Sequence, residues 1–440
     1  MDEQVTDAVG ASAMRKALWH IVPLMLLAYL CAYMDRVNVG FAAVQMNVDL
    51  GFSATIYGLG GGLFFLGYAL FEIPSNMLGV RYGSRRWLAR IMITWGLLSG
   101  GTMFVHTPSQ FYVMRFLLGV AEAGFWPGII YYFALWFPMT HRGRAISRFY
   151  VASPLASVVM GAMSGWLLGL DGLMGLRGWH WLFIVQGLPS VAMGLALLRW
   201  LPDTPASVAW LTAHEKAWIE GGLAHEAALI GEPRTHHPFA ALRNPGVALL
   251  ATTGFFTSGI MTTLGLSAPL LLLASTRLDT VHVGYLVSIG GVIGAVVMLI
   301  AGDHADRRGD RFRDAFWLIL VMAAALLAIA AAPSPLAVML AYLAFAATCF
   351  TINMLLSSGW AEVLHVRELA VGAAAINSVA NLGGFALPFA WGAARDATGG
   401  FAAGLVALAL FALVAAVLTL RVRAGVRRRP ATAAFTNSGT

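Results

Sequence analysis

Long apolar runs separated by short polar segments recur along the whole 440-residue chain. Each run has roughly 20 residues or more, the length that an α-helix needs to cross the hydrocarbon core of a bilayer. The pattern therefore predicts an all-α polytopic membrane protein with twelve transmembrane helices. We place them at 17–40, 53–79, 86–106, 109–137, 142–170, 181–201, 244–275, 279–304, 311–332, 335–362, 367–396 and 399–422.

A polar segment between about Leu201 and Asn244 divides these runs into two sets of six. It contains Thr212-Ala-His-Glu215, a capping-box pattern that predicts the start of a short helix. We expect two pseudo-symmetric six-helix bundles. The predicted divisions are an N-terminal tail at 1–16, a first bundle at 17–201, a linker with a short helix at 202–243, a second bundle at 244–422, and a basic, disordered tail at 423–440.

Composition agrees with a membrane protein and excludes a soluble one. Hydrophobic residues make up 59% of the chain and charged residues 11%, whereas charged residues are about 25% of a soluble domain. The net charge of +7 does not indicate nucleic-acid binding, because of where the 28 Lys and Arg lie. If the N-terminus is cytoplasmic, only Arg177, Arg277 and Arg395 fall on the far side and two fall inside helices, so 23 are cytoplasmic. This bias predicts an inner-membrane protein with both termini in the cytoplasm.

The sequence gives little support for a metal site or a nucleotide-binding site. Cys31 and Cys349 fall in predicted helices of different halves, and neither has a CxxC neighbour, so we expect no disulfide and no metal site. No phosphate-binding loop of the Gly-x4-Gly-Lys-[Ser/Thr] type occurs, and the linker is too short for an ATPase domain. We therefore expect no cofactor.

Four charged residues interrupt the apolar runs: Asp35 and Arg36 in the first, and Arg115 and Glu122 in the fourth. A charge at bilayer depth costs at least ~2.5–3.5 kcal/mol, so it is kept where it meets a partner charge, a water-filled cavity or a solute. Asp35 and Arg36 point about 100° apart on a helix, and Arg115 and Glu122 share one face about 10 Å apart. We infer two candidate alternating pairs, Asp35–Arg115 and Arg36–Glu122.

These residue types suggest a division of roles. A buried carboxylate near an Arg can be tuned to exchange protons, which makes Asp35 and Glu122 candidate proton carriers. An Arg stays charged and binds carboxylates bidentately, which makes Arg36, aided by Arg115, the candidate anion anchor. The alternative is a structural ion network that holds the first and fourth helices together.

Other polar residues in the runs complete the expected site. Glu72 is expected to be structural, and Glu362 to join a loop network. Neutral side chains too polar to face lipid are expected to line a central cavity. They are Tyr33, Tyr68, Ser357, Trp360, Asn377 and Asn381.

Two basic, glycine-bearing loops lie six runs apart, which indicates parallel repeats about an axis along the membrane normal. The second loop, Gly302-x-x-x-Asp306-Arg307-x-Gly309-x-Arg311, resembles the loop signature of the major facilitator superfamily. The first loop carries Arg81, Gly83 and Arg85 but has Val80 and Asn76 where the signature has Asp and Gly. The resemblance implies that both are gating loops. The departure implies a weaker salt bridge in the first.

Three further motifs resemble the anion:cation symporter family. They are Tyr33-Met-Asp35-Arg36-Val-Asn38, Arg115-x3-Gly119-x2-Glu122-x-Gly124 and Asn377-x3-Asn381-x-Gly383-Gly384. Within that family, which includes tartrate, 4-hydroxyphenylacetate and phthalate permeases, the segments Phe41-Ala-Ala-Val-Gln45-Met-Asn47 and Gly67-x4-Glu72-Ile-Pro74-Ser-Asn76 are most similar to the tartrate and hydroxyphenylacetate branch. The resemblance implies a monomeric, non-enzymatic secondary transporter that imports a small organic anion with protons by alternating access. Such an anion is a dicarboxylate, a sugar acid or an aromatic carboxylate.

Other functions remain open at this stage. An exporter or uniporter of a neutral solute would have the same helix pattern, and so would a membrane sensor that does not transport. A membrane-embedded hydrolase is a more distant alternative, because no nucleophile–base set is evident within the runs.

Overall fold

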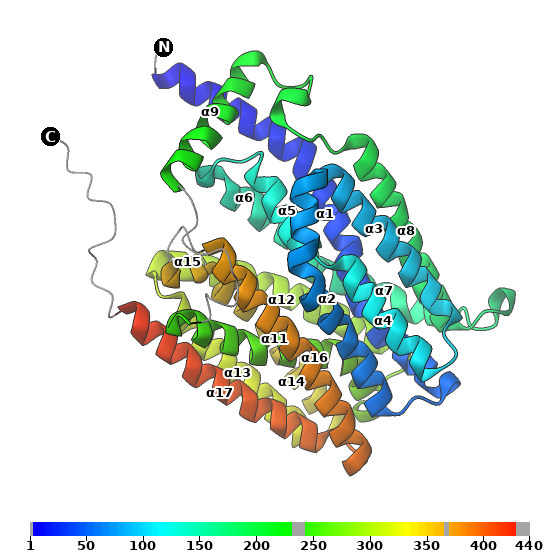
Figure 1. The fold of residues 1–440 in the computed structure, drawn as a ribbon. Coiled ribbons are helices and arrows are strands. Elements are labelled where there is room, and N and C mark those ends of the chain that lie inside the picture. Colours follow the sequence, from blue (N-terminus) through cyan, green and yellow to red (C-terminus); the bar gives the residue numbers. More distant parts are fainter. Residues whose placement is uncertain (1–2, 231–242, 365–368, 428–440) are drawn as a thin grey trace.

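A computed structural model describes residues 3–230, 243–364 and 369–427, and its described residues form helices and no strand (Figure 1). The first half consists of α1 (Glu3–Leu50), α2 (Ala54–Tyr82), α3 (Ser84–Gly101), α4 (Pro108–Glu122), α5 (Phe125–Ala134), α6 (Met139–Tyr150), α7 (Ala152–Leu168) and α8 (Gly178–Trp200). A separate helix, α9 (Ala213–Ile230), follows. The second half consists of α11 (Pro245–Ser275), α12 (Thr280–Arg308), α13 (Arg311–Ala330), α14 (Pro335–Ser358), α15 (Trp360–Val363), α16 (Leu369–Thr398) and α17 (Ala402–Arg427).

The twelve predicted runs correspond to these helices. Among the described residues, eleven helical segments are long and apolar enough to cross a membrane. The one run not included is the third, α3, which carries Arg85, Arg86 and Arg90 near its start and is therefore too polar to be counted by composition. It packs along α8 over most of its length. The predicted fold class, an all-α membrane protein of two six-helix bundles, is confirmed.

Three predicted single helices are interrupted. The fourth run divides into α4 and α5 at Gly124, whose φ of +83° favours glycine. The fifth divides into α6 and α7 at Val151, and the tenth into α14 and α15 at Gly359. The break after α4 places Glu122 at the last residue of that helix.

Side-chain caps explain where many of the helices begin. Ser53, Asp279, Asp310 and Ser334 each accept a hydrogen bond from a backbone N–H of the first turn of α2, α12, α13 and α14. Proline opens α4, α11 and α14, where its missing N–H costs nothing. These short polar residues mark the helix starts.

The two expected tails are partly helical. Helix α1 begins at Glu3, within the expected tail 1–16, and α17 continues to Arg427, within the expected disordered tail 423–440. The difference at α17 has a physical cause, because Arg423 and Arg427 bind Asp310 and extend the helix. The remainder of that tail, 428–440, lies outside the described residues.

The predicted capping box in the linker is confirmed. The Thr212 backbone N–H donates to the Glu215 carboxylate at 2.8 Å, and the Glu215 N–H donates to the Thr212 hydroxyl at 3.3 Å. Glu215 also accepts from Lys16 at 2.8 Å and from Ser12 at 2.7 Å on α1. The linker helix α9 is thereby attached to α1.

The bundles touch through α2 and α16, α7 and α12, and α1 and α11. Glycine lets the backbones meet at these contacts, and two pairs serve as examples. A Cβ on Gly58 would lie 2.3 Å from the Pro388 carbonyl oxygen, and one on Gly161 would lie 2.4 Å from that of Gly284. Both contacts lie near the ends of the helices opposite the chain termini, and in Figure 1 the two bundles diverge toward the termini. The bundles are therefore closed together at the end far from the termini, which we call the far end.

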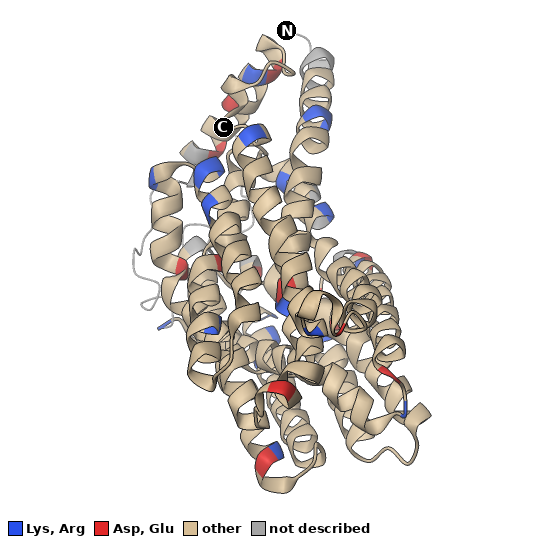
Figure 2. Cartoon of the chain, turned by 90° about the vertical axis from the view of Figure 1, so that its right-hand side faces the viewer, with Lys and Arg blue, Asp and Glu red and all other residues tan. Residues whose placement is uncertain are grey.

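Charge is unevenly distributed along the molecule. In Figure 2 the Lys and Arg positions gather toward the end that carries both termini. At the far end Arg177 lies 3.7 Å from both Asp49 and Asp171. The distribution has the asymmetry expected from the sequence.

Candidate functional site

A cavity of about 330 Å³ lies between the two bundles. The first bundle contributes residues from α1, α2, α5, α6 and α7, and the second contributes residues from α11, α12, α14, α15 and α16. Seven residues predicted from sequence line it: Tyr33, Arg36, Tyr68, Ser357, Trp360, Asn377 and Asn381.

Arg36 and Glu122 form the predicted ion pair. The Arg36 Nε donates to Glu122 Oε1 at 2.7 Å, and its Nη2 lies 2.5 Å from the same oxygen. Glu122 is almost fully buried, whereas the Arg36 side chain keeps about a quarter of its surface exposed. The pair therefore has an Arg at the cavity wall and an acid behind it.

In this pair, one carboxylate oxygen of Glu122 and one guanidinium nitrogen of Arg36 have no hydrogen-bond partner among the described residues. Glu122 Oε2 is buried and has no hydrogen-bond partner among the described residues. The third nitrogen of Arg36, Nη1, likewise has no acceptor among the residues that the structure describes. The guanidinium also lies 5.2 Å from the Tyr68 ring centroid, within cation–π range. An anion in the cavity has access to an Arg that is only partly occupied.

Asp35 does not form the predicted ion pair with Arg115. Its carboxylate instead accepts hydrogen bonds from Trp95 Nε1 at 2.7 Å, from Asn38 Nδ2 at 2.9 Å and from the Ser99 hydroxyl. Two of these donors lie on α3, which the sequence analysis did not connect to Asp35. A Trp and a Ser on an apolar helix resemble ordinary packing residues, so no sequence signal distinguished them.

Arg115 is buried and does not line the cavity. Its guanidinium lies 5.0 Å from the Phe64 ring centroid, and its Nε has no hydrogen-bond partner among the described residues. The ring of Phe64 thus contacts both Arg36 and Arg115 from α2. A direct role for Arg115 in substrate binding stays a prediction that this conformation does not support.

Glu72 connects the two bundles. The Asn377 amide on α16 donates to Glu72 Oε1 on α2 at 2.5 Å, and the other carboxylate oxygen has no partner among the described residues. Asn381, one turn further along α16, donates only to the Asn377 carbonyl oxygen, at 3.0 Å. The sequence analysis expected Asn377 and Asn381 on one face, but it did not predict that Asn377 contacts Glu72.

The two expected gating loops are tight turns. Gly83 and Gly309 have φ of +86° and +65°, which explains glycine at both positions. Arg85 lies 3.0 Å from Asp203 at the start of the linker. Arg81 contacts its neighbour Tyr82, and Gly302 faces Met354 of α14.

The remaining residues of the second loop contact the second bundle. Arg307 pairs with Asp303 one turn back at 2.8 Å. Arg311 donates to the Ser358 carbonyl oxygen at 3.0 Å and lies 3.9 Å from Glu362, which supports the loop-network expectation for that acid. The side chain of Asp306 lies outside the described residues.

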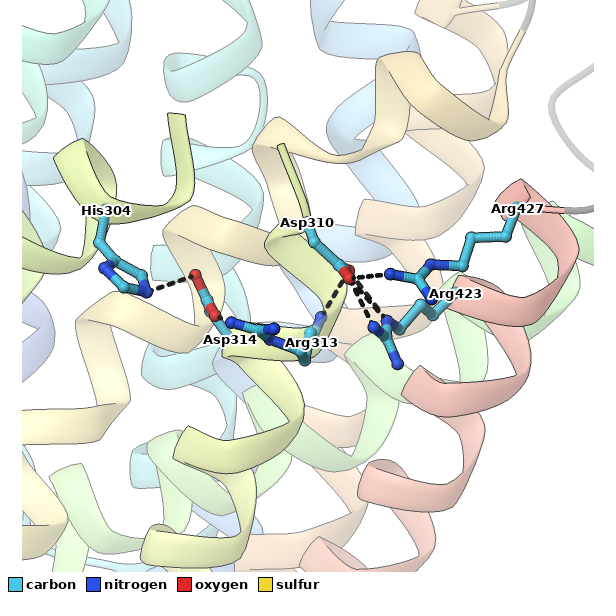
Figure 3. A network of polar contacts seen from close by, with 6 residues as sticks. All are labelled: His304, Asp310, Arg313, Asp314, Arg423 and Arg427. Carbon is cyan, nitrogen blue, oxygen red and sulfur yellow. Dashed lines mark hydrogen bonds and ion pairs between the residues drawn. The ribbon is translucent and has the colours of Figure 1, made fainter. Parts of the chain in front are cut away.

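Asp310, which the sequence analysis did not single out, is the centre of a charge network (Figure 3). It accepts from Arg423 at 2.6 Å, from Arg427 at 2.8 Å and from the Arg313 backbone N–H at 3.2 Å. Burial alone would raise the pKa of Asp310, but its hydrogen bonds to Arg423 and Arg313 and the charge of Arg427 hold that pKa below its ordinary value. The network attaches the α12–α13 loop to α17 within one bundle.

No group of three or more potential metal ligands occurs among the described residues. Cys31 and Cys349 are both unpaired thiols. The chemistry of the site is therefore that of one Arg, buried acids, aromatic rings and amides.

Two six-helix bundles around a central cavity are the architecture of a membrane transporter. The family profile of the Major Facilitator Superfamily matches residues 25–388, and the chain belongs to this family. It is therefore a multi-pass membrane transporter and not an enzyme.

Relatives and solved structures agree with this assignment. The chain is 41% identical over 419 residues to a candidate tartrate transporter of Agrobacterium vitis, covering 95% of this chain and 93% of the relative. It is 38% identical to a quinolone resistance transporter of Acinetobacter baumannii, and the match covers 94% of this chain and 96% of that relative. It is 40% identical to the candidate metabolite transport protein NicT of Pseudomonas putida, and the match covers 87% of this chain and 88% of that relative.

A solved bacterial homologue of the human lysosomal transporter Spinster, inward-facing and unoccupied, superposes with a TM-score of 0.74. The two are 17% identical, and the match covers 93% of this chain and 98% of the solved one. This similarity supports the fold.

Proposed function

We propose that this protein imports a small organic anion together with protons across the bacterial inner membrane, with both termini cytoplasmic. The observation that carries the proposal is the Arg36–Glu122 pair, in which the Arg faces the cavity and the acid lies behind it. The names of the tartrate and metabolite transport relatives support an organic solute.

The pair couples substrate binding to a proton through competition for one guanidinium. A substrate carboxylate that binds Arg36 takes hydrogen bonds that Glu122 now accepts. A buried carboxylate left without its partner is strongly destabilised, by about 3–5 kcal/mol for a broken buried pair. Glu122 then takes up a proton, so that the loaded site holds one cation, one anion and one neutral acid.

This charge balance gives the direction of the coupling. One proton per monoanion makes the loaded step electrically neutral, and the pH gradient alone drives it. A second proton on Asp35 would add the membrane potential as a driving force. Asp35 contacts α3 and not the cavity, so we assign it the secondary role.

The access route follows from the closed far end. The bundles contact each other there through glycines, whereas the cavity lining extends toward the termini to Trp360 and Ile376. With both termini cytoplasmic, the structure corresponds to a state that exchanges solute with the cytoplasm. The opposite state requires the far-end contacts to separate.

The test is uptake into proteoliposomes under an imposed pH gradient. Glu122→Gln imitates a permanently protonated acid, so it should abolish gradient-driven accumulation while anion exchange across the membrane continues. Asp35→Asn should reduce accumulation in the same way. Glu226→Gln is the matched control, because Glu226 pairs with Arg142 at 2.8 Å on the linker side, away from the cavity. Wild-type dependence on the pH gradient in Glu122→Gln would exclude Glu122 as the coupling site.

One relative favours a second function, namely export. The quinolone resistance transporter carries a name that implies outward movement of a drug. The same proteoliposomes with the gradient reversed distinguish the two. When the lumen is acid and protons leave, an exporter that exchanges solute for protons accumulates solute in the lumen. A symporter accumulates solute only when the outside is acid and protons enter.

A further inference from the structure

Within the part of the chain that the structure describes, the cavity is lined by a single charged side chain. Of the residues that line it within the described chain, Arg36 alone is ionised, and no Lys, His, Asp or Glu is among them. Asp35, Glu72, Arg115 and Glu122 all lie behind the lining. The cavity therefore offers one positive charge, and Glu122 already balances part of it.

A substrate with two carboxylates fits this charge poorly. The first carboxylate can bind Arg36, but the second would lie in the cavity without a cation. Burying an unpaired carboxylate is costly even where neutral donors are near, and the group is then expected to become protonated or to stay in water. The single Arg favours a substrate of charge −1.

The other walls are aromatic. Tyr29, Tyr33, Tyr68, Trp126 and Tyr150 line the cavity from the first bundle. The second bundle adds Tyr342, Phe345, Phe350 and Trp360. The rings of Tyr33 and Phe350 face each other between the bundles, with centroids 6.1 Å apart and planes tilted by 51°. Such rings contact another aromatic ring favourably, beyond the gain from burying its surface.

Three carboxamides complete the lining opposite Arg36. Each already donates through its nitrogen to a protein acceptor: Asn353 to Met261 Sδ, Asn377 to Glu72 and Asn381 to the Asn377 carbonyl oxygen. Their oxygens remain as acceptors. An acceptor suits a hydroxyl or N–H on the substrate and repels a second carboxylate.

We infer that the preferred substrate is an aromatic monocarboxylate, and not a dicarboxylate such as the tartrate in the name of its relatives. The carboxylate binds Arg36, and the ring lies between the aromatic walls of the two bundles. This inference rests on the proposed function, since it requires that Arg36 anchors the transported anion. A cavity of about 330 Å³ accommodates a single-ring acid.

The experiment measures binding of four anions to the purified full-length protein at pH 7. Benzoate and 4-hydroxybenzoate carry one carboxylate on a ring, phthalate adds a second carboxylate to the same ring, and tartrate has two carboxylates and no ring. We expect both monocarboxylates to bind at least about tenfold more tightly than phthalate and tartrate. Phthalate or tartrate binding as tightly as the monocarboxylates would overturn the inference.

Two variants test the ring contact. Phe350→Leu should weaken benzoate binding by about three- to tenfold, because it removes one aromatic wall. Phe389→Leu on α16 is the matched control, since Phe389 is exposed and does not line the cavity. Equal benzoate affinities in the two variants would contradict an aromatic binding site.

Arg36→Lys separates failure of this inference from failure of the proposed function. If tartrate binds and its binding depends on Arg36 while benzoate does not bind, only the substrate class is wrong. If no tested anion shows binding that depends on Arg36, both proposals are overturned.

Discussion

At the scale of single residues, the arrangement around Arg36 shows how one cation can serve two anions in turn. Its Nε and Nη2 bind one oxygen of Glu122, while Nη1 and the exposed part of the side chain remain available to the cavity. The fork geometry of the guanidinium allows this shared use, and an ammonium group cannot reproduce it.

Arg36→Lys should therefore weaken anion binding by an order of magnitude or more. The variant keeps the charge but loses the planar fork, and a hydrogen bond to a charged group contributes about 1.5–3 kcal/mol. Equilibrium binding to purified protein measures the change. Arg90→Lys is the control, because Arg90 stacks over Trp87 outside the cavity, 4.0 Å from the ring centroid. Unchanged affinity in Arg36→Lys would exclude it as the anchor.

At the scale of helices, two acidic residues that do not line the cavity each join a pair of helices. Glu215 attaches the linker helix α9 to α1 through Lys16 and Ser12. Glu72 attaches α2 of one bundle to α16 of the other through Asn377. The first contact lies within one half of the protein, whereas the second must change if the bundles move.

The α9–α1 contact should be insensitive to pH in the physiological range. Burial alone would raise the pKa of Glu215, but hydrogen bonds from Lys16, the Thr212 N–H and Ser12 lower it to about 2. Because this pKa is lowered, ionised Glu215 stabilises the contact fully at any pH above the ordinary pKa of a Glu, about 4.3. The stabilisation is lost only as the pH falls from there toward 2. Tryptic cleavage after Lys216 at pH 7 should be slow in the wild type and faster in Glu215→Gln. The variant Glu220→Gln changes an exposed residue on the same helix and should be cleaved at the wild-type rate.

The Glu72–Asn377 bond should bias the separation of the bundles. Asn377→Ala removes the donor and should shift the population toward separated α2 and α16 ends by roughly tenfold or more, given the cost of a charged hydrogen bond. Spin labels at Val80 and Val371, with both native cysteines replaced by Ala, measure that separation by pulsed electron resonance. Asn381→Ala is the control, because its amide bonds only its own helix. The same distance distribution in both variants would show that the bond has no role in the equilibrium.

The sequence predicted the elements better than their contacts. Apolar runs and short capping residues located the helices, and the Thr212–Glu215 capping box and the Arg36–Glu122 pair were both predicted correctly. Of the two candidate alternating pairs, Asp35 with Arg115 is not formed in this conformation. The sequence could not indicate which pair would be formed, because the rotation of a helix that is apolar on all sides cannot be read from its periodicity. For the same reason Trp95 and Asn377 could not be connected to Asp35 and Glu72 from sequence.

At the scale of the whole molecule, the two bundles form a closed far end through backbone contacts at glycine. These contacts involve α2 with α16 and α7 with α12, so they are built from both halves. A side chain at either glycine cannot be accommodated without moving a backbone segment. The closed state thus depends on the absence of side chains at a few positions.

Gly58→Ala should open the far end. Its new Cβ would meet the Pro388 carbonyl oxygen, so the closed arrangement becomes strained while each bundle keeps its own packing. A cysteine at Thr262, a cavity-lining position on α11, should then react faster with an impermeant reagent added from the far side. Gly100→Ala on α3 is the control, because nothing lies within 4 Å of its Cβ position. Identical reactivity in both variants would contradict a far-end gate at Gly58.

The far end has one more feature, the contact of Asp396 with the start of α2. Its two carboxylate oxygens accept the backbone N–H groups of Ala54 and Thr55, at 3.0 and 2.7 Å, from across the bundle interface. A helix of one bundle is thus capped by a residue of the other, and each opening of the far end exposes these two amides to water. The exchange of their protons for deuterium therefore records how often this end of the transporter opens, without any added label.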